Sequence, residues 1–183
     1  MKAIETYYKN YRFRSRLEAR YAVFFDALDL QWDYEMEGFD FQDGDLYLPD
    51  FFLSDLGIFV EVKGEFPTAY EVRLCRKLQF HTGFDVMLCS NLPDKNDSLL
   101  FSSSESNGGC LTETWVRWID LITRDVSDAA IAAKQARFEH GERPNLELPK
   151  KHQFEYIPKK VQTSELYKWY QQQQKEKDQQ GKE

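Results

Sequence analysis

Residues 48–65 read LPDFFLSDLGIFVEVKGE, and this stretch decides the fold that the sequence predicts. Two apolar runs flank SDLG at 54–57, four residues of types that favour turns. We therefore expect a β-hairpin with a four-residue loop. Three charged residues, Asp50, Glu61 and Lys63, lie among the apolar ones, where a charged group needs a partner or a chemical task.

The loop length also predicts the register of the hairpin. If Leu53 pairs with Ile58, Asp50 lies opposite Glu61. Opposed side chains on one sheet face have Cβ atoms about 5 Å apart, so the two carboxylates repel each other unless a proton or a cation intervenes. Because side chains alternate along a strand, Lys63 shares the face of Glu61.

Two carboxylates and an ammonium on one sheet face suit metal-assisted hydrolysis of a phosphodiester. Carboxylate oxygens bind Mg²⁺, and the ammonium of Lys63 could position water or offset developing charge. The competing interpretation is structural. Asp50 and Glu61 would then face solvent, and Lys63 would pair with Glu61 or Glu65 on the sheet surface.

The elements around the hairpin follow from periodicity and from turn residues. Helices are predicted over 15–30 with Ser15 as N-cap, over 67–83 closed by Gly83, and over 127–141 capped by Ser127 or Asp128 and ended by Gly141. Strands are predicted within 31–41, 46–53, 58–64 and 84–90. Residues 91–109 are predicted to be a loop, and 114–123 fit a strand or a helix equally.

This order predicts an α/β domain over residues 1–125. A helical C-terminal extension over 126–183 is predicted to follow it and to end in a polar, glutamine-rich tail.

Composition narrows the class of protein. The chain has 183 residues with 42% hydrophobic and 15% aromatic side chains, which predicts a globular protein. It contains no apolar run long enough for a transmembrane helix and no apolar N-terminal signal segment. Cys75, Cys89 and Cys110 form no CxxC pair. We therefore expect reduced thiols, a cytoplasmic protein, and neither a disulfide framework nor a zinc site.

Charge is unevenly distributed although the net charge is −7. Residues 1–20 and 150–177 are rich in lysine and arginine, whereas residues 21–65 hold twelve acids and one base, Lys63. The acidic centre could hold a cation while the basic flanks meet phosphates. Scattered surface charge explains the same pattern equally well.

The motif Pro49-Asp50, ten residues, then Glu61-Val62-Lys63 resembles the signature of the PD-(D/E)xK nuclease superfamily. The resemblance covers residues 12–90 and is nearest to small phage or bacterial members, near junction-resolving and transposase-type endonucleases. It implies a restriction-endonuclease-like core, with a central mixed β-sheet flanked by helices. It also implies a DNA endonuclease in which Asp50 and Glu61 bind Mg²⁺ or Mn²⁺ while Lys63 assists hydrolysis.

Glu18 has two interpretations. SRLE at 15–18 is a capping-box pattern, in which Glu18 would bind backbone at Ser15. The resemblance instead implies a third catalytic acid and metal ligand from this helix, and Glu18 holds the matching position. We predict that its carboxylate lies within water-bridging distance of Asp50.

Basic residues near this helix are candidates for phosphate contacts, although a solvated helix face would look the same. They are Arg12, Arg14, Arg16 and Arg20. The resemblance further implies a homodimer, because compact members commonly dimerise. Two other expectations stay open, namely a non-catalytic nucleic-acid-binding or protein-interaction module with the nuclease fold, and a protein partner that docks on residues 127–183.

Overall fold

The computed structural model describes residues 3–93, 98–103, 110–122 and 126–138. Its helices are α1 (Arg16–Ala27), α2 (Ala69–Thr82), α3 (Trp118–Ile122) and α4 (Ser127–Gln135). Its strands are β1 (Thr6–Tyr8), β2 (Tyr11–Phe13), β3 (Trp32–Tyr34), β4 (Phe39–Asp40), β5 (Leu46–Tyr47), β6 (Phe51–Leu53), β7 (Ile58–Lys63), β8 (Asp85–Ser90), β9 (Ser98–Ser103) and β10 (Leu111–Val116). No helix in the described ranges has both the length and the apolar character needed to cross a membrane.

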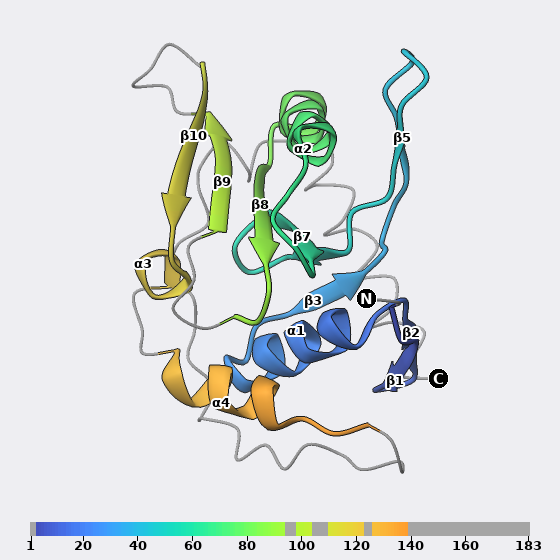
Figure 1. Cartoon of the computed structure of the whole chain (residues 1–183). Coiled ribbons are helices and arrows are strands. Elements are labelled where there is room, and N and C mark those ends of the chain that lie inside the picture. The colour runs from blue at the N-terminus through green and yellow to red at the C-terminus, as the bar shows by residue number, and fades with distance from the viewer. Residues whose placement is uncertain (1–2, 94–97, 104–109, 123–125, 139–183) are drawn as a thin grey trace, which may run out of the picture.

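Six strands form one mixed sheet in the order β10-β9-β8-β7-β6-β3 (Figure 1). β7 and β8 run parallel, and the other neighbouring pairs are antiparallel. Two small antiparallel pairs, β1-β2 and β4-β5, lie beside it. The predicted α/β class, with a central mixed sheet flanked by helices, is confirmed.

The hairpin forms in the predicted register. Leu53 pairs with Ile58 across the four-residue turn, and Phe51 pairs with Val60. Gly57 ends the turn with φ of 63°, a left-handed conformation that glycine adopts without a steric penalty. One step beyond the last paired residues, the same register places Asp50 opposite Glu61.

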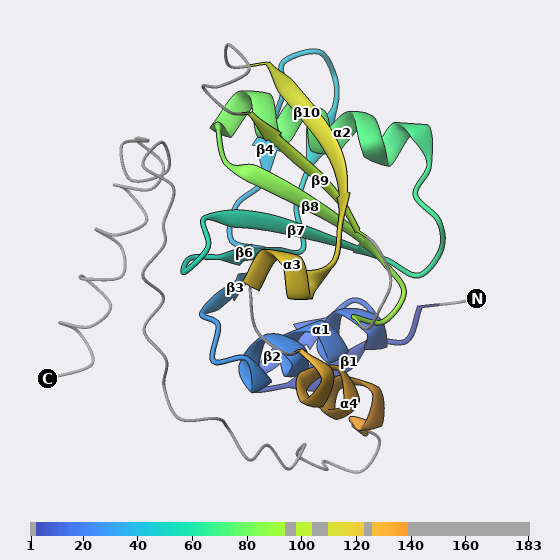
Figure 2. The same ribbon diagram turned by 90° about the vertical axis from the view of Figure 1, so that its left-hand side faces the viewer.

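Helices cover both faces of the sheet (Figure 1, Figure 2). Val60 belongs to an apolar cluster with residues of α1, α3 and α4, including Phe25 and Trp118. Phe59 points the other way, into a cluster with Leu78 of α2. Because β7 is buried on both faces, its sequence is almost continuously apolar, as is typical of central strands. Glu61 interrupts that pattern at the middle of the sheet.

The first two helices begin where the sequence predicts. The hydroxyl of Ser15 accepts a hydrogen bond from the Glu18 amide at the start of α1. At the start of α2, Thr68 and Glu71 form a complete capping box. Gly83 closes α2 in the left-handed conformation, with φ of 73°. These boundaries depend on contacts within a few residues, which explains why they were predictable.

The prediction of a loop over 91–109 is wrong in part, because Ser98–Ser103 form β9. Serines at both ends of SLLFSS suggested a loop, but Leu99 and Phe101 are buried against α2. The strand pairs with β8 on one side and β10 on the other. Partners on both sides override the weak strand signal of the segment.

Residues 114–123 resolve into both alternatives. The first part completes β10, and α3 begins at Trp118, whose side chain is buried.

The prediction for α4 needs two corrections. Its N-cap is Val126 rather than Ser127 or Asp128, and it ends at Gln135 rather than near Gly141. Ala129 and Ala133 pack into the α1 side of the core, so tertiary contacts fix α4 more than capping does.

The boundary predicted near residue 125 stays a prediction, although α4 packs against α1. Most of the predicted C-terminal extension, residues 139–183, lies outside the described residues. The same holds for residues 104–109 of the serine- and glycine-rich segment at 102–109.

Candidate active site

Asp50 lies immediately before β6 and is almost fully buried, with 4% of its surface exposed. Its Oδ2 accepts a hydrogen bond of 2.8 Å from the Val62 amide, across the hairpin. Its Oδ1 lies 3.5 Å from a guanidinium nitrogen of Arg14. Its backbone carbonyl accepts from the Glu35 amide at 2.9 Å, which extends the pairing of β3 and β6. Asp50 is therefore held by backbone on both sides.

Glu61 projects from the middle of β7 and is equally buried, at 4% exposed. Its Oε2 accepts a hydrogen bond of 2.8 Å from the Tyr47 hydroxyl. Its Oε1 forms an ion pair of 2.5 Å with the ammonium of Lys63. The ammonium also lies 3.7 Å from Glu71 of α2. The prediction that Lys63 shares a face with Glu61 is confirmed.

The electrostatics show that Asp50 experiences an excess of negative charge. Burial, followed by the nearby charges of Glu61 and Glu18, raises the pKa of Asp50 well above its ordinary value, and the Val62 amide and Lys63 offset only part of this. This is the repulsion between opposed acids that the register predicts. A divalent cation would relieve it.

Lys63 remains a cation in this environment. Burial disfavours the charged ammonium, but Glu61, with smaller contributions from Asp50 and Glu71, raises the pKa of Lys63 above its ordinary value. An ammonium that stays charged at neutral pH can orient a phosphate oxygen or a water molecule. It can also stabilise negative charge that develops there.

Glu18 binds groups at the start of α1, but the capping box predicted for it does not form, because its carboxylate accepts no hydrogen bond from the Ser15 amide. Its Oε1 accepts a 2.5 Å hydrogen bond from the Ser15 hydroxyl, and its Oε2 accepts from the Tyr34 hydroxyl at 2.5 Å and the Arg14 amide at 3.1 Å. The carboxylate thus binds the amide one residue before the N-cap. Its charge nevertheless acts on Asp50. A role for Glu18 as metal ligand, and its water-bridging distance from Asp50, remain predictions.

We expect Glu18→Ala to lower the free energy of unfolding by about 2 kcal/mol, because the half-buried Tyr34 hydroxyl loses its acceptor and the Arg14 amide loses one of its two acceptors. Tyr34→Phe, which removes one of these bonds, should cost about 1 kcal/mol. Urea unfolding monitored by circular dichroism measures both changes. Equal stability of Glu18→Ala and wild type would show that the network does not anchor the helix.

The four arginines predicted to contact DNA are separated by the fold. Arg14 reaches the acidic centre, where it pairs with Glu35 at 2.5 Å as well as approaching Asp50. Arg12 pairs with Glu5 on the exposed face of β2. Arg16 and Arg20 lie four residues apart on α1 and so share one face of that helix.

Two tyrosines belong to the site but were not predicted. Tyr47 donates to Glu61 from β5, and Tyr34 donates to Glu18 from β3. Both acceptors lie far along the chain from their donors, so no local spacing marks the pairs. Hydrogen bonds of this kind orient a carboxylate and limit which of its oxygens remain available.

Cys75 lies beside this network, with its sulfur 3.6 Å from the Tyr47 hydroxyl. Burial raises the pKa of the Cys75 thiol to about 12, so the thiol is protonated at neutral pH. Because the thiolate is the nucleophilic form, Cys75 is not a nucleophile here. The charged groups of the site are therefore its carboxylates and its cations.

The described part of the chain contains no group of three or more histidine, cysteine, aspartate or glutamate side chains that could hold a metal ion together. The two carboxylates of Asp50 and Glu61 are a smaller set. Mg²⁺ commonly binds proteins through one or two carboxylates and completes its coordination with water and substrate phosphate. The residues present therefore fit a Mg²⁺ ion that shares its coordination with a phosphate.

Comparisons with known proteins add no assignment: no family model, no curated protein and no solved structure matches this chain.

Proposed function

We propose that this protein is a Mg²⁺- or Mn²⁺-dependent DNA endonuclease with a restriction-endonuclease-like core. One observation carries the proposal. Asp50 and Glu61 are buried and electrostatically opposed at one end of the hairpin, with the Lys63 ammonium 2.5 Å from Glu61. Two carboxylates that can bind a metal ion, with a cation beside one of them, suit metal-assisted hydrolysis of a phosphodiester.

A bound Mg²⁺ would polarise the scissile phosphate and lower the pKa of a coordinated water. Asp50 and Glu61 would hold the ion through their carboxylate oxygens. The Val62 amide and the Tyr47 hydroxyl keep those carboxylates in place when substrate binds. Lys63 would move from its ion pair with Glu61 toward the phosphate. It would there position water and stabilise the added charge.

Arg14 has a second task in this proposal. Its side chain is 57% exposed while its guanidinium approaches Asp50, so it can bind a phosphate oxygen without leaving the site. Guanidinium groups bind phosphate through two parallel hydrogen bonds. Arg14 would therefore bring the DNA backbone to the acidic centre, where repulsion between carboxylates and phosphate would otherwise oppose binding.

Nicking of supercoiled plasmid tests the proposal. We expect the purified chain to convert supercoiled plasmid to open circles with Mg²⁺ or Mn²⁺ and to do nothing in EDTA. A panel of duplex, single-strand, flap and four-way-junction substrates would then identify the preferred DNA structure. Absence of cleavage on every substrate with either metal would contradict the endonuclease assignment.

A non-catalytic binding module is the second candidate, and one observation favours it. Lys63 pairs with Glu61 and Arg14 approaches Asp50, so the acidic centre already has cationic partners within the chain. Such a module would bind DNA or a protein without turnover. DNA binding by wild type that is identical in EDTA and Mg²⁺, with no cleavage, would support it.

Protein partners are proposed separately. We propose that residues 127–183, of which α4 is the described part, dock a second protein that supplies DNA targeting. A homodimer is the further expectation for an enzyme that cuts two strands. Pull-down with and without residues 139–183 tests the first, and sedimentation equilibrium tests the second.

A further inference from the structure

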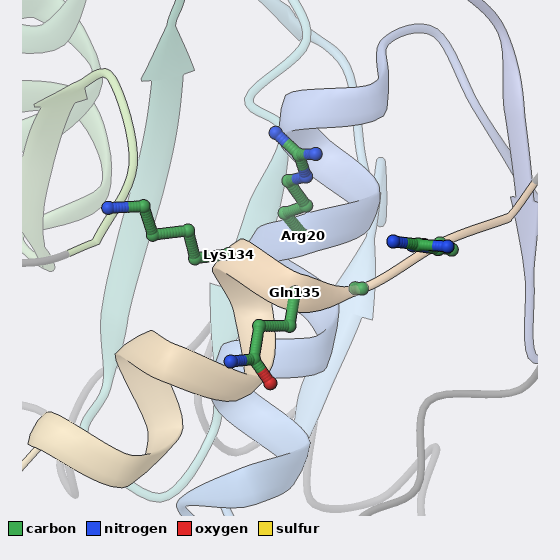
Figure 3. A pocket seen from close by; sticks show the side chains of 5 residues that line it. Arg20, Lys134 and Gln135 are labelled. Atoms are coloured by element: carbon green, nitrogen blue, oxygen red, sulfur yellow. The ribbon is translucent and has the colours of Figure 1, made fainter.

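An open hollow lies where the end of α4 meets the second turn of α1. Its volume is about 490 Å³, and it is lined by Arg20 of α1 together with Lys134, Gln135, Ala136 and Arg137. In Figure 3, Arg20 extends from α1 while Lys134 and Gln135 extend from the end of α4, each in a different direction. None of the described residues that line the hollow is acidic.

The three cations of this hollow are unlike the other lysines and arginines in the described ranges. Each of the others has an ion pair or another contact, as Arg76 has with Glu113 and Arg117 with Asp120. For the cations of the hollow, the described residues supply no hydrogen bond and no ion pair. The chain has a net charge of −7, yet the three lysines and arginines that lack a partner within the described ranges all line one hollow.

We propose that this hollow binds a phosphate group. The Nε of Arg20 is buried and has no hydrogen-bond partner among the described residues, so one donor of a guanidinium that lines the hollow is unsatisfied. Arg137 and Lys134 add positive charge from the other helix, and the Gln135 amide adds a neutral donor. Guanidinium and ammonium groups from two elements around one space match the charge and the acceptor oxygens of a phosphate.

Stabilisation of α4 explains only part of this arrangement. A lysine in the last turn of a helix interacts favourably with the partial negative charge at that end, and Lys134 occupies such a position. Arg20 belongs to a different helix, of which it is the fifth residue. Its presence in the hollow has no explanation in the capping of α4, whereas a shared anionic ligand explains all three cations.

The phosphate is most simply that of a nucleic-acid backbone, and this step alone rests on the proposed function. Arg20 follows Glu18 by two residues on α1, which is about 3 Å along the helix axis and about 200° around it. The hollow therefore opens away from the acidic centre but near the same end of the helix. A phosphate bound there would belong to a nucleotide that flanks the cut rather than to the scissile position.

The test compares three forms of the full chain in EDTA, so that cleavage plays no part. They are wild type, a double variant Lys134→Gln/Arg137→Gln, and a control Arg76→Gln/Arg117→Gln that loses the same charge at paired positions. Titration calorimetry with inorganic phosphate is the first measurement. Fluorescence anisotropy with a labelled duplex oligonucleotide, repeated over a range of salt concentrations, is the second.

We expect the double variant to bind inorganic phosphate about 10-fold more weakly than wild type, because two charge-assisted contacts are lost. The control should stay within about 2-fold of wild type. If the backbone is the source, DNA affinity should fall in parallel, and the slope of log affinity against log salt should decrease by about 1. Arg20→Gln should reproduce the loss from the other helix.

Weaker phosphate binding with unchanged DNA binding would assign the hollow to a free phosphate or a phosphorylated small molecule. Unchanged phosphate binding in the double variant would overturn the proposal, and so would an equal loss in the control. None of these measurements depends on metal. If wild type cuts no substrate but the variants lose phosphate binding, the endonuclease proposal is contradicted and the phosphate site stands.

Discussion

Asp50→Asn is expected to lower the rate of plasmid nicking by more than about 100-fold, and Glu61→Gln should do the same. Each substitution removes one negative oxygen from an opposed pair while keeping the size of the side chain. Loss of residues that merely support metal ligands costs 10- to 100-fold, so loss of a ligand should cost at least that much. The assay is nicking with Mg²⁺ at protein concentrations that exceed those needed for wild type.

The same Asp50→Asn variant should be more stable than wild type in metal-free buffer. The folded protein raises the pKa of Asp50, so this carboxyl favours folding when it is protonated. Its contribution is complete below the unfolded pKa of about 3.9 and is lost as pH rises through the folded pKa. In EDTA, the stability advantage of the asparagine variant should therefore grow from pH 4.5 to pH 8, as thermal unfolding would show.

Asp43→Asn is the matched control. A hydrogen bond from Lys77 lowers the pKa of Asp43, so this carboxylate favours folding when ionised, and its replacement should not stabilise the chain at neutral pH. It should also leave nicking unchanged. Two results would contradict the assignment of Asp50. One is wild-type nicking by Asp50→Asn, and the other is a marked loss of its stability in EDTA, which would make the carboxylate structural.

Lys63→Ala should reduce turnover by roughly 100-fold or more, the size of effect seen when a group that stabilises transition-state charge is removed. Binding of Mn²⁺ should be spared, because the ammonium is not a ligand and because its removal frees Glu61 Oε1. Titration calorimetry with Mn²⁺ separates the two effects. In the metal-free form the variant leaves Glu61 buried without its cation, which should lower its thermal stability.

Lys77→Ala removes the same charge from a lysine whose partners, Asp43 and Asp45, lie in the β4–β5 region. We expect it to leave both nicking and Mn²⁺ binding unchanged. If Mn²⁺ affinity instead collapses in Lys63→Ala along with activity, Lys63 holds the carboxylates together. The separation of metal binding from charge stabilisation would then be wrong.

The sequence alone determined the hairpin and what it displays. The four-residue turn fixes the pairing of β7 with β6, so the register could be predicted. That register places Asp50 opposite Glu61, and Lys63 lies on the face of Glu61. The start of α1 and both ends of α2 were equally readable. In each case the determining contacts join residues that are close in the chain, and local geometry has few alternatives.

Only the tertiary structure decided the rest. β9 forms because β8 and β10 offer it backbone partners, although its own residues resemble a loop. Tyr47 reaches Glu61 across fourteen residues. Arg14 and Arg20 look alike in the sequence, yet one approaches the acidic centre and the other lines the hollow with α4. Such pairings depend on how distant elements pack together. Closing a longer loop costs little additional entropy, so many distant pairings are feasible and no spacing along the chain selects one of them.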